Sequence, residues 1–139
     1  MIILDTNVLS ALMRKAPERA VVNWLDRQPA ESVWITSITL FEARFGIALL
    51  AKGRRKQALE AVFDELLAED LQGRVLDFDR AAAEAAAQLA SNRQRKGRAI
   101  DMRDTQIAGI VIARRARLAT RNVRHFADLG AAVIDPWSE

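Results

Sequence analysis

Short apolar runs recur along the chain and alternate with longer segments in which apolar residues repeat at helical spacing. Each run is too short for a helix and is rich in Ile, Val and Leu, which is typical of a buried strand. The pattern therefore predicts five strands separated by helices. The runs span residues 1–4, 33–37, 74–78, 117–120 and 132–134.

The segments between these strands predict six helices. Pro17 suits the first turn of the second helix, Asp79 is expected to cap the fifth, and Gly97 follows its end. Alternation of strand and helix predicts an α/β fold with a parallel sheet covered on both faces, in a single domain over residues 1–139. In such sheets ligands bind at the carboxyl ends of the strands. The predicted helices span residues 6–14, 17–27, 39–51, 56–71, 79–96 and 103–115.

The composition removes several kinds of chemistry. The chain has 139 residues, no cysteine, no tyrosine and one histidine, His125. Disulfides, thiolate metal sites, cysteine nucleophiles and pairs of catalytic histidines are excluded, and a reducing compartment is expected. Acid–base or metal chemistry is left mainly to carboxylates. No apolar stretch near the start is long enough for a signal peptide or a membrane span, so we expect a cytosolic protein with no membrane partner.

The net charge of the chain indicates less about its partners than the positions of the charged residues do. The net charge is +3, from 21 basic and 18 acidic residues, and this is weak evidence for a nucleic-acid partner. Basic residues cluster at 52–56, 93–103 and 114–124, and most of them are arginines, whose planar fork binds phosphate. The clusters fit either phosphate binding or ordinary solvated helix ends.

Three acids are expected at the carboxyl edge of the sheet. Asp5 directly follows the first strand, and Glu42 and Asp104 each begin an otherwise apolar helix face, so both are expected to point toward the edge of the core. Each position also has a structural interpretation. Asp5 can cap a helix, Glu42 forms a capping-box pattern with Thr39, and Asp101 is expected to cap the helix of Asp104.

Converging carboxylates favour a divalent cation. Two of them ~4 Å apart repel by ~4 kcal/mol at an effective dielectric of ~20. All-oxygen ligation suits Mg²⁺ or Mn²⁺, which can activate water and bind a phosphate oxygen, as in metal-dependent nucleases. Three polar residues after the fourth strand could join this site. Asn122 could hold a metal-bound water or cap the next segment, Thr120 could orient a carboxylate, and Arg121 could face a phosphate.

Four motifs together resemble a known family. Residues 3–8, 36–42, 104–109 and 118–122, with Phe126, are similar in order and spacing to PIN-domain toxins of VapC type, in the FitB-like branch. The resemblance covers nearly the whole chain. It implies a three-layer sandwich with a roughly five-stranded parallel sheet and an endoribonuclease that depends on Mg²⁺ or Mn²⁺. Asp5 and Asp104 match the metal-ligating aspartates, and Glu42 matches their acidic partner. Asn122 stands where many members have a fourth acid and others have Asn, and His125 stands where the family motif often has an aspartate.

The resemblance also implies partners. Such toxins dimerise and are silenced by a small antitoxin that also binds DNA, alone or in a larger complex. We expect a groove for an antitoxin segment between the helices at 17–27 and 39–71, where Trp24 and Phe63 look exposed. Arg98 and Arg121 are expected to steady the backbone of a single-stranded RNA substrate.

Other functions fit the residues less well. A phosphatase with an aspartyl intermediate needs a second aspartate two residues after Asp5, where this chain has Asn7. A phospho-receiver domain expects an acidic pair after the first strand and a lysine after the last, and no lysine follows Lys96. A catalytically lapsed PIN-like scaffold that acts only through partner binding remains an alternative, because of Asn122 and His125.

Overall fold

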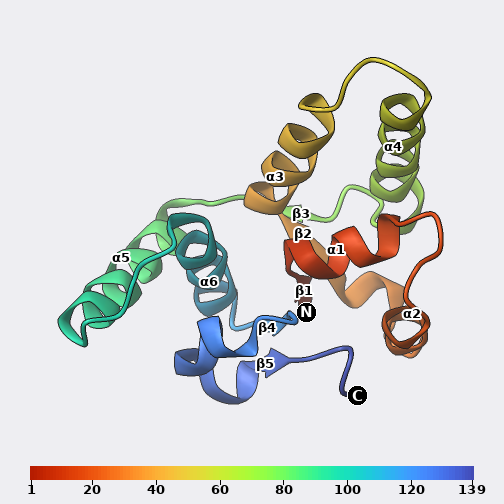
Figure 1. Cartoon of the computed structure of the whole chain (residues 1–139). Helices are drawn as coiled ribbons and strands as arrows, with labels where there is room; N and C mark the ends of the chain where they lie inside the picture. Colours follow the sequence, from red (N-terminus) through yellow and green to blue (C-terminus); the bar gives the residue numbers. More distant parts are fainter.

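A parallel sheet with helices on both faces organises the chain (Figure 1). The computed structural model describes residues 1–139, apart from the side chain of Ala131. Within this described part the sheet has five strands in the order β3-β2-β1-β4-β5, and every neighbouring pair is parallel. The predicted α/β fold is thereby confirmed. The strands are β1 (Ile2–Leu4), β2 (Val33–Thr36), β3 (Val75–Leu76), β4 (Arg117–Ala119) and β5 (Val133–Ile134).

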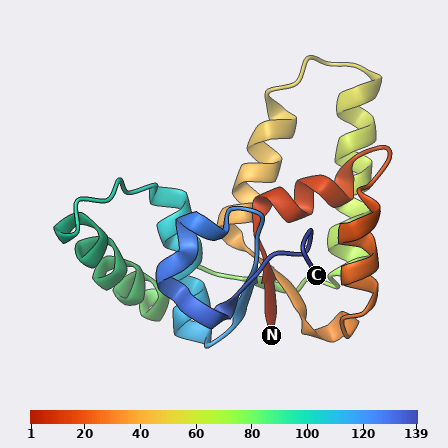
Figure 2. The same cartoon turned by 60° about the horizontal axis from the view of Figure 1, so that its bottom comes forward.

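The helices form two groups on opposite sides of the sheet. In Figures 1 and 2, α5 and α6 lie together on one side, while α1, α2 and α4 lie on the other, and α3 stands beside α4 in an arm that projects from the sheet. A π-helical turn (Leu66–Asp70) follows α4, and a 3₁₀ segment (Val123–Ala132) joins β4 to β5. The α-helices are α1 (Thr6–Met13), α2 (Arg19–Asp26), α3 (Ser37–Ala48), α4 (Arg54–Glu65), α5 (Arg80–Arg95) and α6 (Met102–Arg114).

Both faces of the central strand β1 are buried. Ile2 and Leu4 pack into a core formed with α1, α2 and α4, whereas Ile3 packs against α5 and α6. Successive side chains of a strand point to opposite faces, so one short apolar run serves two cores. Across the second core, Gly109 of α6 lies so close to α5 that an added Cβ would fall 2.5 Å from the carbonyl oxygen of Ala82.

Three predicted helix starts are wrong, and one of them is that of α4, which begins at Arg54 rather than at residue 56. Glu18, not Pro17, is the N-cap of α2, so the proline precedes the helix rather than entering it. Helix α3 begins at Ser37, because Oγ1 of Thr36 at the end of β2 accepts a 3.1 Å hydrogen bond from the Thr39 amide. The predicted capping box of Thr39 and Glu42 therefore does not form. The caps predicted at Asp79 and Asp101 are confirmed.

The predicted exposure of two aromatic residues is also wrong. Trp24 is 3% exposed and Phe63 is 0% exposed, and both belong to the core of α1, α2 and α4. Conversely, the apolar residues that share a helix face with Glu42 lie outside the core: Phe45 is 44% exposed and Leu49 70%. Helix α3 instead buries Thr39 and Ile47. Among the described residues no helix is long and apolar enough to span a bilayer.

Candidate active site

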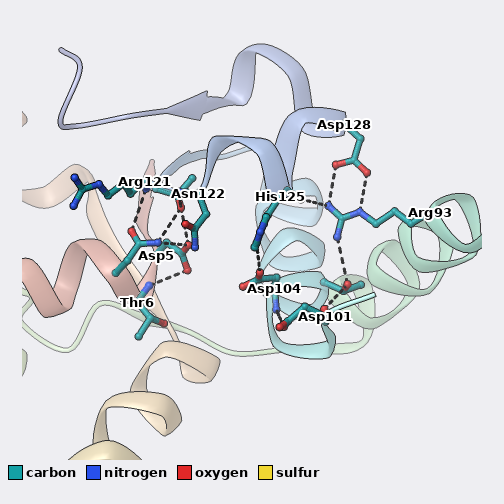
Figure 3. A network of polar contacts seen from close by, with 12 residues as sticks. Asp5, Thr6, Arg93, Asp101, Asp104, Arg121, Asn122, His125 and Asp128 are labelled. Atoms are coloured by element: carbon teal, nitrogen blue, oxygen red, sulfur yellow. Dashed lines mark hydrogen bonds and ion pairs between the residues drawn. The ribbon is translucent and has the colours of Figure 1, made fainter. Parts of the chain in front are cut away.

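Asp5 is a buried carboxylate at the carboxyl end of β1. Its side chain caps α1, since Oδ1 accepts a 2.8 Å hydrogen bond from the Thr6 amide. The second oxygen, Oδ2, accepts from the hydroxyl of Thr120 at 2.7 Å and from Nδ2 of Asn7 at 3.2 Å. Capping therefore uses one oxygen, while the other faces the polar residues after β4 (Figure 3).

The segment after β4 is fixed to the end of β1. Strands β1 and β4 are parallel neighbours, with Leu4 opposite Ala119, so the residues that follow them meet at one edge of the sheet. Thr120 is fully buried, orients Asp5 as predicted, and accepts a 3.0 Å hydrogen bond from the Asn122 amide. Asn122 itself is exposed and lies beside Asp5 in Figure 3.

Glu42 comes from the second turn of α3 and is tied to the residue after Asp5. Its Oε1 accepts a 2.7 Å hydrogen bond from the hydroxyl of Thr6, and that hydroxyl also lies 3.0 Å from Oγ1 of Thr39. Its Oε2 forms an ion pair with Arg103 of α6 at 3.6 Å, and the glutamate side chain is 22% exposed. Arg103 is a site neighbour that the sequence did not reveal.

Asp104 lies in the first turn of α6, where its amide donates to the capping Asp101. Its Oδ2 is 3.2 Å from Nδ1 of His125, which reaches it from the 3₁₀ segment after β4 (Figure 3). The Asp104 side chain is 21% exposed and that of His125 61%. No site role was predicted for His125, although its place before Phe126 in the family motif was a usable signal.

Behind His125 lies a partly buried ion pair that the sequence did not reveal. The guanidinium of Arg93, on α5, donates two 2.8 Å hydrogen bonds to Asp128 and a third, at 3.0 Å, to the main-chain oxygen of His125. The Arg93 side chain is 5% exposed, and its hydrogen bond holds the pKa of Asp128 below its usual value. Arg98, predicted to contact RNA, lies 3.1 Å from the same carboxylate, whereas Arg121 lies over the ring of Trp137.

The three acids share one electrostatic environment. The pKa of Asp5 is raised from 3.8 to about 6; burial is the largest cause of this rise, and the charges of Asp104 and Glu42 contribute to it. Hydrogen bonds from Thr120 and Thr6 act in the opposite direction, because they favour the carboxylate. The chain therefore brings Asp5, Glu42 and Asp104 to one edge, where a proton or a cation relieves their repulsion.

The oxygen atoms at this edge fit a hydrated divalent cation. Among the described residues no three acidic or histidine side chains form a ready-made cage for an ion. Mg²⁺ does not need one, since it usually keeps several waters and is bound through one or two carboxylates. Asp5 and Asp104 can supply these carboxylates, and Asn122 can reach such an ion through water.

A five-stranded parallel sheet with one acid directly after β1 and two more on α3 and α6 at its carboxyl edge is the arrangement of a PIN-like nuclease domain. The PIN domain family model matches residues 2–132, and the chain belongs to this family. It is 36% identical to Toxin FitB of Neisseria gonorrhoeae over 139 residues, which is 100% of both chains. It is also 36% identical to VapC ribonuclease Y4jK of Sinorhizobium fredii over 137 residues, covering 99% of this chain and 98% of the relative.

A solved structure agrees with these relatives. The structure of FitAB bound to the IR36 DNA fragment contains a chain that aligns with a TM-score of 0.89 and 36% identity. The alignment covers 99% of this chain and 96% of that one. The predicted resemblance to VapC-type PIN toxins of the FitB-like branch is thereby confirmed.

Proposed function

We propose that this chain is a divalent-metal-dependent endoribonuclease, and that it is the toxin of a type II toxin–antitoxin pair. The main support for the nuclease activity is the buried Asp5, whose pKa is raised by burial and by the nearby charges of Asp104 and Glu42. One relative is named a ribonuclease, which supports RNA as the substrate, and another is named a toxin, which supports the toxin role.

In this proposal Asp5, Glu42 and Asp104 hold one Mg²⁺, for which Mn²⁺ can substitute, and Asn122 contributes through water. Such an ion, when bound, acidifies a water molecule and neutralises charge on a phosphodiester. Thr120 keeps Oδ2 of Asp5 in place through its 2.7 Å hydrogen bond.

Two arginines are proposed to position the substrate. The amide of Arg121 donates to Oδ1 of Asn7 at 3.1 Å, which fixes its main chain next to the site and leaves its guanidinium at the surface. The side chain of Arg98 is 37% exposed beside Asp128. Both can contact phosphates of a single-stranded RNA, in binding that weakens as salt rises.

Cleavage of a mixed RNA pool tests the nuclease. The purified chain, freed of any partner, is expected to cut RNA with Mg²⁺ or Mn²⁺ and to stop when a chelator is added. Asp104→Asn should remove the cutting. Asp79→Asn is a matched control for Asp5→Asn, because Asp79, like Asp5, caps a helix after a strand, and asparagine caps equally well. Full activity of an Asp5→Asn variant would refute the assignment of the site.

For the antitoxin we propose a groove different from the one predicted around Trp24 and Phe63. A groove of about 890 Å³ lies between α1, α3 and α4, and Thr6 and Glu42 of the site stand among its lining residues. Its walls are mainly apolar and include Ile47 and Leu59. Four basic residues also line it, so the proposed occupant is an amphipathic antitoxin segment with acidic groups. They are Arg14, Lys15, Arg54 and Arg55.

A substitution that fills the groove tests this position. A Cβ at Gly46 would meet nothing within 4 Å, so Gly46→Leu should fold normally and project into the groove. We expect it to lose a co-expressed antitoxin that the wild-type chain retains through purification. Ala87→Leu, at an exposed position of α5, is the matched control. Retention of the antitoxin by Gly46→Leu would exclude the groove as the antitoxin-binding site.

The scaffold alternative is favoured by one observation, namely that Asn122 and His125 stand where many family members have acids. A scaffold has no need of an ion, so titration of the partner-free chain with Mn²⁺ separates the two functions. Absence of both metal binding and RNA cutting would favour the scaffold.

A further inference from the structure

His125 faces Asp104 at a separation that suits two ligands of one ion. Nδ1 of the imidazole lies 3.2 Å from Oδ2 of the carboxylate. Two ligands at roughly 2.1 Å on neighbouring vertices of an octahedron are about 3 Å apart. An ion can therefore replace the hydrogen bond between these atoms at about the same separation, once the imidazole turns so that the lone pair of Nδ1 points at the ion instead of at Oδ2.

The main chain of His125 is anchored on both sides of its Cα atom. Its amide donates a 3.0 Å hydrogen bond to the carbonyl oxygen of Asn122, and its own carbonyl oxygen accepts from Arg93 at 3.0 Å. Arg93 is itself fixed by two hydrogen bonds to Asp128. The imidazole thus sits on a rigid support, which reduces the entropy lost when a ligand is immobilised.

The proton on Nε2 of the imidazole also has a hydrogen-bond acceptor. A histidine that binds a metal through Nδ1 carries its proton on Nε2, which needs a hydrogen-bond acceptor. The His125 side chain is 61% exposed, so water can accept from Nε2.

We propose that His125 is a nitrogen ligand of the metal site, together with Asp104. The inference rests on the proposed nuclease function and adds to it the kind of metal preferred. Carboxylate and water suit Mg²⁺, whereas imidazole suits later transition metals and zinc, and affinity rises along the series from Mn²⁺. The site therefore binds Mn²⁺ and Zn²⁺ more tightly, relative to Mg²⁺, than a site built from carboxylates alone.

Nitrogen NMR of the full chain reads the proposed bond directly, because His125 is the only histidine. When Zn²⁺ is added to the partner-free, ¹⁵N-labelled chain, Nδ1 is expected to move to the shift of a metal-bound nitrogen and Nε2 to that of a protonated one. Asp104→Asn should abolish this change at the same zinc concentration.

Calorimetric titrations with Mn²⁺ and Mg²⁺ provide the second measurement. The hydrogen-bonding partners of metal ligands alone contribute ~10–100-fold to affinity. His125→Gln is therefore expected to weaken Mn²⁺ binding by at least about tenfold and Mg²⁺ binding much less, and His125→Asp should shift the preference toward Mg²⁺. Arg124→Gln, at the exposed neighbouring position, is the matched control and should change neither affinity.

The outcomes separate this inference from the proposed function. Metal binding that depends on Asp104 but leaves both ring nitrogens of His125 unchanged would overturn the ligand role and leave the nuclease site intact. Failure of the wild-type chain to bind any of the three ions would overturn both.

Discussion

The hydroxyl of Thr120 donates a 2.7 Å hydrogen bond to Oδ2 of Asp5, across 115 positions of sequence. Each residue directly follows one of two neighbouring parallel strands, β1 and β4, so the topology of the sheet creates the contact. The bond lowers the pKa of Asp5 and partly offsets the effect of burial. Thr120 therefore helps to keep Asp5 ionised, which is the form that binds a cation.

Thr120→Val tests this relationship, since valine keeps the shape of threonine and removes the donor. A hydrogen bond to a charged group contributes about 1.5–3 kcal/mol. We expect the pKa of Asp5 to rise above its value in the wild-type chain, and divalent-metal affinity near neutral pH to fall on the order of tenfold. Carbon NMR of the aspartates against pH, with metal titration, gives both values. An unchanged Asp5 pKa in the variant would contradict the role given to Thr120.

Asp5 also predicts how stability depends on pH in the metal-free chain. Its pKa is raised from 3.8 to about 6, so between these values the folded chain binds more protons than the unfolded chain. Stability is therefore greatest below pH 3.8 for this group alone and is lost as pH rises through about 6, a total of about 3 kcal/mol. Asp128, whose pKa is lowered, contributes in the opposite sense, and its contribution is lost only as the pH falls through its lowered pKa.

The measurement is urea unfolding from pH 4 to pH 7, with chelator and then with Mg²⁺. Asp5→Asn should flatten the decline that the wild-type chain shows between pH 4 and pH 6. Mg²⁺ should stabilise the wild-type chain more at pH 7 than at pH 4, because only the ionised carboxylate binds it. Parallel curves for wild type and Asp5→Asn would show that Asp5 has an ordinary pKa.

The sequence predicted the elements of the fold better than their environment. Buried parallel strands are nearly continuous apolar runs, so all five could be found from local pattern. Helix caps were predicted where a lone polar residue precedes a helix, as at Asp101. The capping box at Thr39 and Glu42 failed because Thr36, at the end of a strand, supplies a competing cap three residues earlier.

Long-range contacts were the part that the sequence could not supply. Arg93 looks like an ordinary cation in the last turn of a helix, and its burial depends on Asp128, 35 residues away. Trp24 was expected at the surface because helical spacing fixes which residues share a face but not which face turns to the core. Asp5 was found because it follows a strand, and Glu42 and Asp104 were found because each begins an apolar helix face. Arg103 and His125 became visible only when α3, α6 and the segment after β4 met.

The Arg93–Asp128 pair predicts a large effect on stability. Removing one partner of a fully buried ion pair leaves an uncompensated charge and costs about 3–5 kcal/mol; Arg93 is buried but Asp128 is 19% exposed, so the lower end of this range is expected here. We expect Asp128→Ala to destabilise the chain by this amount in urea unfolding. It should also loosen the hydrogen bond from Arg93 to the main-chain oxygen of His125. Arg98→Met is the matched control, because Arg98 is 37% exposed and its pair with Asp128 contributes only ~0–1 kcal/mol. Similar small losses in both variants would mean that the pair is not effectively buried.

Gly109 allows α5 and α6 to pack closely enough for Arg93 and Asp104 to face the same segment. A Cβ at this position would lie 2.5 Å from the carbonyl oxygen of Ala82 and 2.7 Å from Cβ of Ala86. Alanine in a helix interior is normally about 1 kcal/mol more favourable than glycine, and Gly46→Ala, with nothing within 4 Å of the new Cβ, should gain that amount.

At Gly109 the clash outweighs this gain, because the nearest atom belongs to the backbone and cannot rotate away. Overpacking of this kind costs about 1–3 kcal/mol. Gly109→Ala is therefore expected to destabilise the chain in urea unfolding while Gly46→Ala stabilises it. The variant should also lose metal affinity, because a wider spacing moves Asp104 relative to Asp5. Stabilisation of the chain by both substitutions would show that α5 and α6 can separate freely, and the close packing would then have no role in placing Asp104.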